Sequence, residues 1–101
     1  MSTLSQNDLS RCRVIIDDLD RRIIALLNER TAVVEQIGRI KEELHLGIYE
    51  PKREDQVLEN VLAHSSGPLP PDSIKRIFER IMDEMRTLQK MKLHNGHSEN
   101  Q

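Results

Sequence analysis

The stretch DLSRCRVIIDDLDRRIIALLNERTAVVEQIGRIKEEL, residues 8–44, decides the fold because it contains no proline and keeps one apolar period throughout. Apolar side chains recur at alternating steps of four and three residues, which is the heptad pattern of a helix that packs along a seam. The sequence therefore predicts a single helix over about 8–44. Its seam positions are Cys12, Ile16, Leu19, Ile23, Leu26, Arg30, Val33, Ile37, Ile40 and Leu44.

The predicted first helix is too long for a monomer of this size. It would measure about 54 Å at 1.5 Å per residue. A compact chain of 101 residues is only on the order of 30–35 Å across. The helix would therefore extend past any core that its own chain builds and leave its apolar seam uncovered. We expect a second copy to cover it, which predicts an intertwined or side-by-side homodimer.

Two shorter helices are predicted after the first. Pro51 suits the first turn of a helix over about 51–64, because its missing N–H is not needed there. The Pro- and Ser-rich segment that follows is typical of a loop, and a third helix is expected over about 72–93. We expect a flexible N-terminus over 1–7 and a disordered polar tail over 94–101, on either side of one all-α domain over 8–93.

Composition and charge exclude several functional classes. A net charge of −2 argues against nucleic-acid binding, which needs a concentrated basic stripe. The single Cys12 excludes an intrachain disulfide framework and fits a reducing compartment. The sequence has no signal peptide pattern and no apolar membrane span, so we expect a cytoplasmic protein. His94 and His97 lie in the polar tail without further ligands, so no metal and no cofactor is expected.

Charged side chains interrupt the apolar seam of the first helix. Arg30 occupies a seam position, where an unpaired charge is costly and calls for a partner or a ligand. Lys41 lies on nearly the same face, about 16 Å away along the helix, so the two long side chains can converge on a small anion. Arg13 is about 25 Å from Arg30, so within one chain it does not reach the same site. In a dimer, the partner's copy of that arginine would.

The second and third helices repeat this pattern. Arg53 and Glu54 stand in the first turn of the second helix, and Gln89 continues the apolar line of the third. A neutral amide on such a line supplies a hydrogen-bond donor without adding charge. Each residue alone also fits a plainer interpretation, as a register-setting seam residue, a surface charge or a helix-end pair. Periodicity alone therefore predicts a helical dimer with a polar pocket.

The ordered set of polar residues resembles the AroQ class of chorismate mutase. The similar stretches are RVIIDDLDRRIIALLNERTAVVEQIGRIK at 13–41, IYEPKRE at 48–54 and IFERIMDEMRTLQ at 77–89. They include parts of all three predicted helices. The resemblance implies a homodimer that converts chorismate into prephenate, without a cofactor, in aromatic amino-acid biosynthesis. It also implies two sites per dimer, each completed by the long helix of the other chain.

The resemblance also implies roles for individual residues. Arg30 and the partner chain's Arg13 would grip the substrate carboxylates, and Arg53 would add positive potential. Lys41 would contact a carboxylate and the ether oxygen, and Gln89 would donate to that same oxygen. The ring hydroxyl would be bound by Glu54 and the backbone near Glu50.

Two positions depart from the family pattern. Glu50 replaces a frequent Asp, which is a mild change if the backbone is the binding group. Met85 stands where many relatives carry a Ser that hydrogen-bonds a substrate carboxylate, and a thioether cannot donate. We expect this loss to weaken substrate binding by roughly 1.5–3 kcal/mol, unless another group replaces the bond, and to leave the chemistry intact.

Three alternatives share the predicted fold. An isochorismate-pyruvate lyase has a similar set of basic residues, but the adjacent Arg53 and Glu54 favour the mutase. A non-catalytic dimer that regulates a partner enzyme of aromatic biosynthesis is a second alternative, which Met85 leaves open. A coiled-coil adaptor is the third, although it would not need Arg30, Lys41, Glu54 and Gln89 together.

Overall fold

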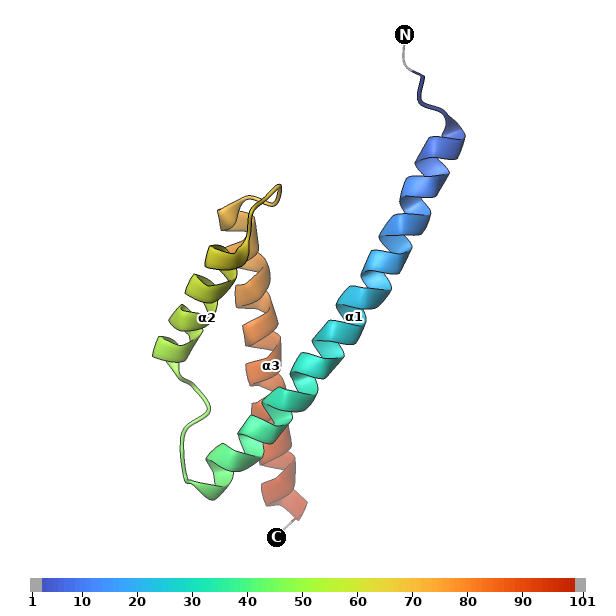
Figure 1. Ribbon diagram of the computed structural model, residues 1–101. Coiled ribbons are helices and arrows are strands. Elements are labelled where there is room, and N and C mark those ends of the chain that lie inside the picture. The colour runs from blue at the N-terminus through green and yellow to red at the C-terminus, as the bar shows by residue number, and fades with distance from the viewer. Residues whose placement is uncertain (1–2, 100–101) are drawn as a thin grey trace. The chain divides into compact units, whose positions relative to one another are not determined.

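The computed structural model describes residues 3–99, which fold into three helices joined by short loops (Figure 1). Helix α1 spans Gln6–Glu43, α2 spans Pro51–His64 and α3 spans Pro71–Glu99. Within 3–99 there is no strand, so the prediction of an all-helical protein with three helices is confirmed. None of these three helices is long and apolar enough to cross a membrane.

Helix α1 begins two residues earlier than the sequence predicts, because Ser5 and Asp8 cap it. The backbone N–H of Ser5 donates to Asp8 Oδ2 at 2.8 Å, and the backbone N–H of Asp8 donates to Ser5 Oγ at 3.4 Å. This reciprocal pair is a capping box, in which two side chains satisfy backbone donors that a helix start leaves unpaired. Residues 3–5 precede the helix without regular structure.

A left-handed residue at position 45 ends helix α1. His45 has φ of +57°, a conformation that is strained for a side chain with a Cβ. The N–H of Leu46 bonds Lys41 O at 2.8 Å, and the N–H of His45 bonds Glu42 O at 3.2 Å. These two bonds form a Schellman motif, which satisfies carbonyls at a helix end and turns the chain away from the helix axis. The loop that follows carries Ile48, Tyr49 and Glu50 toward α2.

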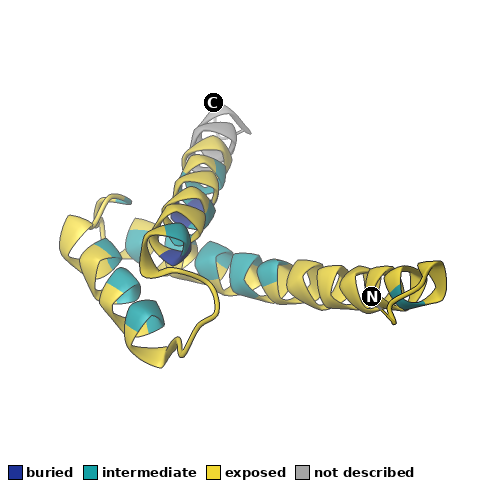
Figure 2. Ribbon diagram, turned by 90° about the horizontal axis from the view of Figure 1, so that it is seen from above, coloured by how far each residue is buried: buried dark blue, intermediate teal, exposed yellow. Residues whose placement is uncertain are grey.

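The chain forms two compact units, and the core lies in the second. The first unit covers residues up to Val33, and the second begins at Val34. In the second, α2 packs against α3, and the buried apolar residues Ile74, Met82 and Met85 all lie on α3. Figure 2 shows these as the dark blue segments of that helix. Among the side chains that the structure describes, these three form a small core for a chain of this length.

Helix α1 has a large exposed apolar surface, and no residue in its whole length is buried (Figure 2). Ile16, Ile23 and Leu26 of the predicted seam are 54%, 53% and 63% exposed. Ile37 and Ile40, on the part of α1 that belongs to the second unit, are also exposed. An apolar stripe of this extent is unusual on a monomeric protein surface.

Helix α3 is longer than the sequence predicts. Its backbone continues to Glu99, past the expected end near residue 93 and into the segment that was expected to be disordered. Each further residue of a formed helix adds one backbone hydrogen bond, so a polar segment can extend a helix that is already nucleated. The side chains of residues 93–101, which include His94 and His97, lie outside those that the structure describes.

Candidate active site

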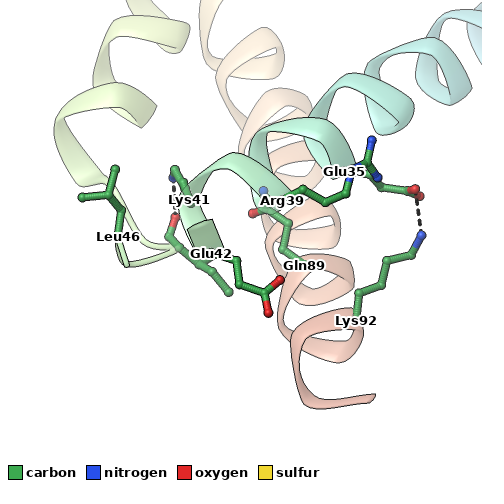
Figure 3. Close-up of a pocket in the computed structure, with 9 residues that line it drawn as sticks. Glu35, Arg39, Lys41, Glu42, Leu46, Gln89 and Lys92 are labelled. Carbon is green, nitrogen blue, oxygen red and sulfur yellow. Dashed lines mark hydrogen bonds and ion pairs between the residues drawn. The ribbon is translucent and has the colours of Figure 1, made fainter. Parts of the chain in front are cut away.

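A cavity of about 240 Å³ lies between the C-terminal part of α1, the loop after it and α3 (Figure 3). Two of the predicted catalytic residues, Lys41 and Gln89, line it together. All of its lining residues belong to the second compact unit. The other lining residues are Glu35, Gly38, Arg39, Glu42, Leu46, Ile48 and Lys92.

Lys41 is fixed by two acceptors from the loop that precedes α2. Its Nζ donates to Ile48 O at 3.1 Å and forms an ion pair with Glu50 Oε1 at 2.5 Å. The lysine side chain is only 13% exposed, whereas that of Glu50 is 52% exposed. An ammonium carries three donors, so one N–H remains beyond these two interactions.

Gln89 crosses from α3 to the backbone of α1. Its Nε2 donates to Val34 O at 3.1 Å, and the amide has a second N–H for another acceptor. Gly38 of α1 also faces this side chain: a Cβ there would lie 3.6 Å from Gln89 Nε2, an ordinary van der Waals distance. Lys41 and Gln89 therefore bring a cationic donor from α1 and a neutral donor from α3 to the same cavity.

Glu54 is held by a residue that the sequence did not single out. Arg86 of α3 forms an ion pair with it through Nε and Nη2, across the contact between α2 and α3. The hydrogen bond to Glu54, more than any other contact, raises the pKa of Arg86 above its ordinary value. Arg86 lies four residues after Met82 and three before Gln89, so helical spacing puts it beside both. This helical spacing is the sequence signal that would have marked Arg86 as a candidate site residue.

The other predicted residues of the second unit have different surroundings. Arg53 is exposed at the start of α2, and its Nη1 donates to Gln56 Oε1 at 3.5 Å. Met85 is 7% exposed and belongs to the core rather than to the cavity lining. Glu50 is the N-cap residue of α2, yet its side chain makes no capping hydrogen bond and pairs with Lys41 instead.

Arg13 and Arg30 lie on the part of α1 that belongs to the first unit. Arg13 is exposed, and Arg30 is half-buried on the predicted seam. The structure thus brings Lys41, Gln89 and Glu50 together near one cavity and links Glu54 to α3. The roles predicted for the two arginines involve a second copy of the chain and stay predictions.

The fold and this cavity define a small all-helical protein with a candidate site that is lined by helix-borne Lys, Gln and carboxylate side chains. Residues 12–90 match the family model described as chorismate mutase type II. Since the match covers most of the chain, the protein belongs to the chorismate mutase type II family.

Curated relatives and solved structures agree with the family. The chain is 31% identical over 90 residues to a bifunctional chorismate mutase/prephenate dehydratase of Pseudomonas aeruginosa, covering 83% of this chain and 24% of the relative. It is 26% identical to a chorismate mutase of Methanocaldococcus jannaschii, and the match covers 91% of this chain and 94% of the relative. The structure of a chorismate mutase from Thermus thermophilus superimposes with a TM-score of 0.79 at 35% identity. The match covers 81% of this chain and 93% of that one. The chain thus spans about a quarter of the bifunctional relatives it matches.

Proposed function

We propose that the chain is a chorismate mutase that rearranges chorismate into prephenate. The observation that carries this proposal is that Lys41 and Gln89 line one cavity. They come from different helices and both present N–H donors, a cation on one wall and a neutral amide on the other. The names of its relatives, including the full-length match to a chorismate mutase, support the same substrate.

The rearrangement is intramolecular and conserves all atoms. The bond between the ether oxygen and the ring breaks, while a bond forms between the methylene carbon of the enolpyruvyl group and the ring. Partial negative charge grows on the ether oxygen during this step. Donors that are already oriented toward that oxygen stabilise the transition state more than the ground state. The two acceptors of Lys41 and the Val34 carbonyl that holds Gln89 supply this orientation.

The remaining polar residues would bind the parts of the substrate that do not react. Holding the side chain over the ring in a reactive geometry lowers the entropic part of the barrier. Glu54 and the backbone of Glu50 would bind the ring hydroxyl. Met85 would offer no donor at a position where many relatives carry a Ser. We assign the two carboxylates of the substrate to Arg30 and Arg13 of the partner subunit, while Arg53 would add positive potential that helps to order them.

We propose further that the enzyme is an intertwined homodimer. The exposed seam of α1 supports this, because a second copy is the simplest cover for an apolar stripe that its own chain leaves open. Such a dimer would supply Arg13 in trans. It would also account for the small core of the single chain, because much of the apolar burial would come from the second copy.

The bifunctional relatives suggest where the product goes. Their names join a chorismate mutase to a prephenate dehydratase in one protein. We propose that prephenate made by this chain passes to a partner enzyme of aromatic amino-acid biosynthesis, in the cytoplasm.

The direct test is to incubate the purified protein with chorismate and follow its loss by ultraviolet absorbance. The product is identified by acid conversion to phenylpyruvate. We expect saturable prephenate formation that Lys41→Ala abolishes. Conversion of isochorismate into salicylate and pyruvate, without turnover of chorismate, would assign the lyase activity instead. Turnover of neither compound would leave a regulatory dimer.

A further inference from the structure

Arg86 and Glu54 link α3 to α2 through a side-chain ion pair with several hydrogen-bond contacts. Nη2 of the arginine lies 2.7 Å from Oε1 and 2.5 Å from Oε2 of the carboxylate, and Nε lies 3.2 Å from Oε2. The two side chains are 23% and 28% exposed, so solvent screens the pair less than a surface pair. A planar guanidinium that meets a carboxylate with two nitrogens fixes its direction as well as its charge.

The arginine is itself held on two further sides. Its guanidinium carbon lies 5.0 Å from the centre of the Tyr49 ring, within the range of a cation–π interaction. Its Nη1 lies 3.4 Å from Asp83 Oδ1, one turn earlier on α3. Tyr49 belongs to the loop whose neighbouring residues, Ile48 and Glu50, hold Lys41. Arg86 thus contacts α2 and the loop that fixes the catalytic lysine.

We propose that Arg86 is a positioning residue, which acts through Glu54 to orient the carboxylate that binds the ring hydroxyl of the substrate. This rests on the proposed function. A carboxylate has about four acceptor sites, so it can bind Arg86 and still accept a hydrogen bond from a substrate hydroxyl. The arginine also offsets the negative charge of Glu54, which would otherwise repel a substrate with two carboxylates.

Two other roles for Arg86 make different predictions. If it only clamps α2 to α3, its loss lowers the free energy of unfolding and leaves the KM of the folded fraction unchanged. If it binds a substrate carboxylate directly, its loss raises KM whether or not Glu54 is present. A double-mutant cycle separates these roles, because residues that act through one another give non-additive effects.

The cycle compares the unchanged protein with Arg86→Met, Glu54→Gln and the double variant, by kcat and KM for chorismate. Methionine keeps an unbranched apolar side chain but removes the guanidinium group with its charge and its donors. Arg80→Met is the matched control, because Arg80 lies on the same helix in a pair with Glu84 whose side chains are 77% and 62% exposed. Circular dichroism and thermal unfolding determine the folded fraction of each variant.

We expect Arg86→Met to lower kcat/KM about tenfold, mainly through KM, which corresponds to about 1.4 kcal/mol. In the Glu54→Gln background the same substitution should cost less than about twofold. Arg86→Lys should recover part of the KM, because it restores the charge but not the two-pronged geometry. Arg80→Met should leave both constants unchanged.

Equal losses in both backgrounds would overturn the proposal and assign Arg86 to direct substrate binding. An unchanged KM with a lower unfolding temperature would overturn it in favour of a structural clamp. An unchanged protein that does not turn over chorismate would refute the proposed function itself. If the unchanged protein is active but the variants do not behave as expected, the positioning role fails and the proposed function stands.

Discussion

The ion pair between Lys41 and Glu50 joins the end of α1 to the start of α2, with Nζ and Oε1 2.5 Å apart. The lysine side chain is largely covered, while the glutamate side chain is half exposed. Glu50 stands at the N-cap of α2, where a side-chain oxygen often bonds the helix backbone, but here the carboxylate turns to the lysine. The residue that begins α2 therefore also orients the cation proposed to act on the ether oxygen.

Glu50→Gln tests whether this pair orients Lys41 for catalysis. The amide keeps the size of the side chain but removes its charge, so the ammonium loses its strongest fixed acceptor. We expect kcat for chorismate to fall about threefold to tenfold, because a less oriented donor stabilises the transition state less. The free energy of unfolding should change by less than about 1 kcal/mol, since half-exposed ion pairs contribute little. Glu59→Gln, on the exposed surface of α2, is the control. An unchanged kcat would contradict an orienting role for Glu50.

Gln89→Glu should make the activity depend on acidic pH. A neutral amide donates at every ordinary pH, so we expect the unchanged protein to keep its kcat through the neutral range. A glutamate donates only when protonated, and its ordinary pKa is about 4.3. The variant should therefore lose kcat as pH rises from about 4 to 7. Gln36→Glu, exposed on α1, should keep the profile of the unchanged protein. A variant as active at neutral pH as at acidic pH would exclude Gln89 as a donor to the ether oxygen.

The three helices could be predicted from the sequence because local signals determine them. The four-three spacing of the first helix and Pro51 at the start of the second each act over a few residues. Helix α1 ends at Glu43, within one residue of the predicted end, but it ends through the left-handed His45 rather than through the glycine that is usual in that conformation.

The contacts of the candidate site were harder to predict because they depend on tertiary register. Arg86 and Glu54 are 32 residues apart, and their meeting depends on how α2 lies against α3. The pairing of Lys41 with Glu50 depends on the path of the loop between α1 and α2. A pattern along one helix gives the face on which a charge lies. It does not give the partner on another element.

His45→Gly should stabilise the protein. His45 holds φ of +57° in the Schellman motif, and glycine adopts this conformation without the steric cost of a Cβ. Relief of this strain, about 1–2 kcal/mol, outweighs the greater unfolded-state entropy of glycine, about 0.4–1 kcal/mol. We expect the free energy of unfolding to rise by about 0.5–1 kcal/mol, which denaturant titration measures. Ala63→Gly, in the last turn of α2, is the opposite control, because it only removes a good helix former. A lower stability for His45→Gly would mean that the imidazole makes a larger contribution than the strain costs.

Met85→Ser tests the binding position that departs from the family pattern, and Met85→Ala is its matched control. Both variants remove a buried thioether and should lower the free energy of unfolding by about 2–5 kcal/mol. They differ only in a hydroxyl, which can donate to a substrate carboxylate. We expect the KM for chorismate to be several-fold lower with serine than with alanine. Equal KM values would show that this position, which lies in the core, does not reach the substrate.

Mixing two inactive variants tests the proposed contribution of Arg13 in trans. In Arg13→Ala dimers both sites lack an arginine from the partner subunit, and in Lys41→Ala dimers both sites lack the lysine. A heterodimer of the two has one site with both defects and one with neither, if the arginine acts across the interface.

Equal amounts of the two chains, unfolded and refolded together, should form heterodimers as about half of all dimers, so roughly a quarter of the sites become intact. We therefore expect about a quarter of the activity of the unchanged protein, measured by loss of chorismate, whereas each variant refolded alone stays inactive. If the arginine acted within its own chain, both sites of the heterodimer would carry one defect and no activity would return. Size-exclusion chromatography of the mixture, with one chain tagged, verifies that heterodimers have formed, so an inactive heterodimer would exclude the role in trans.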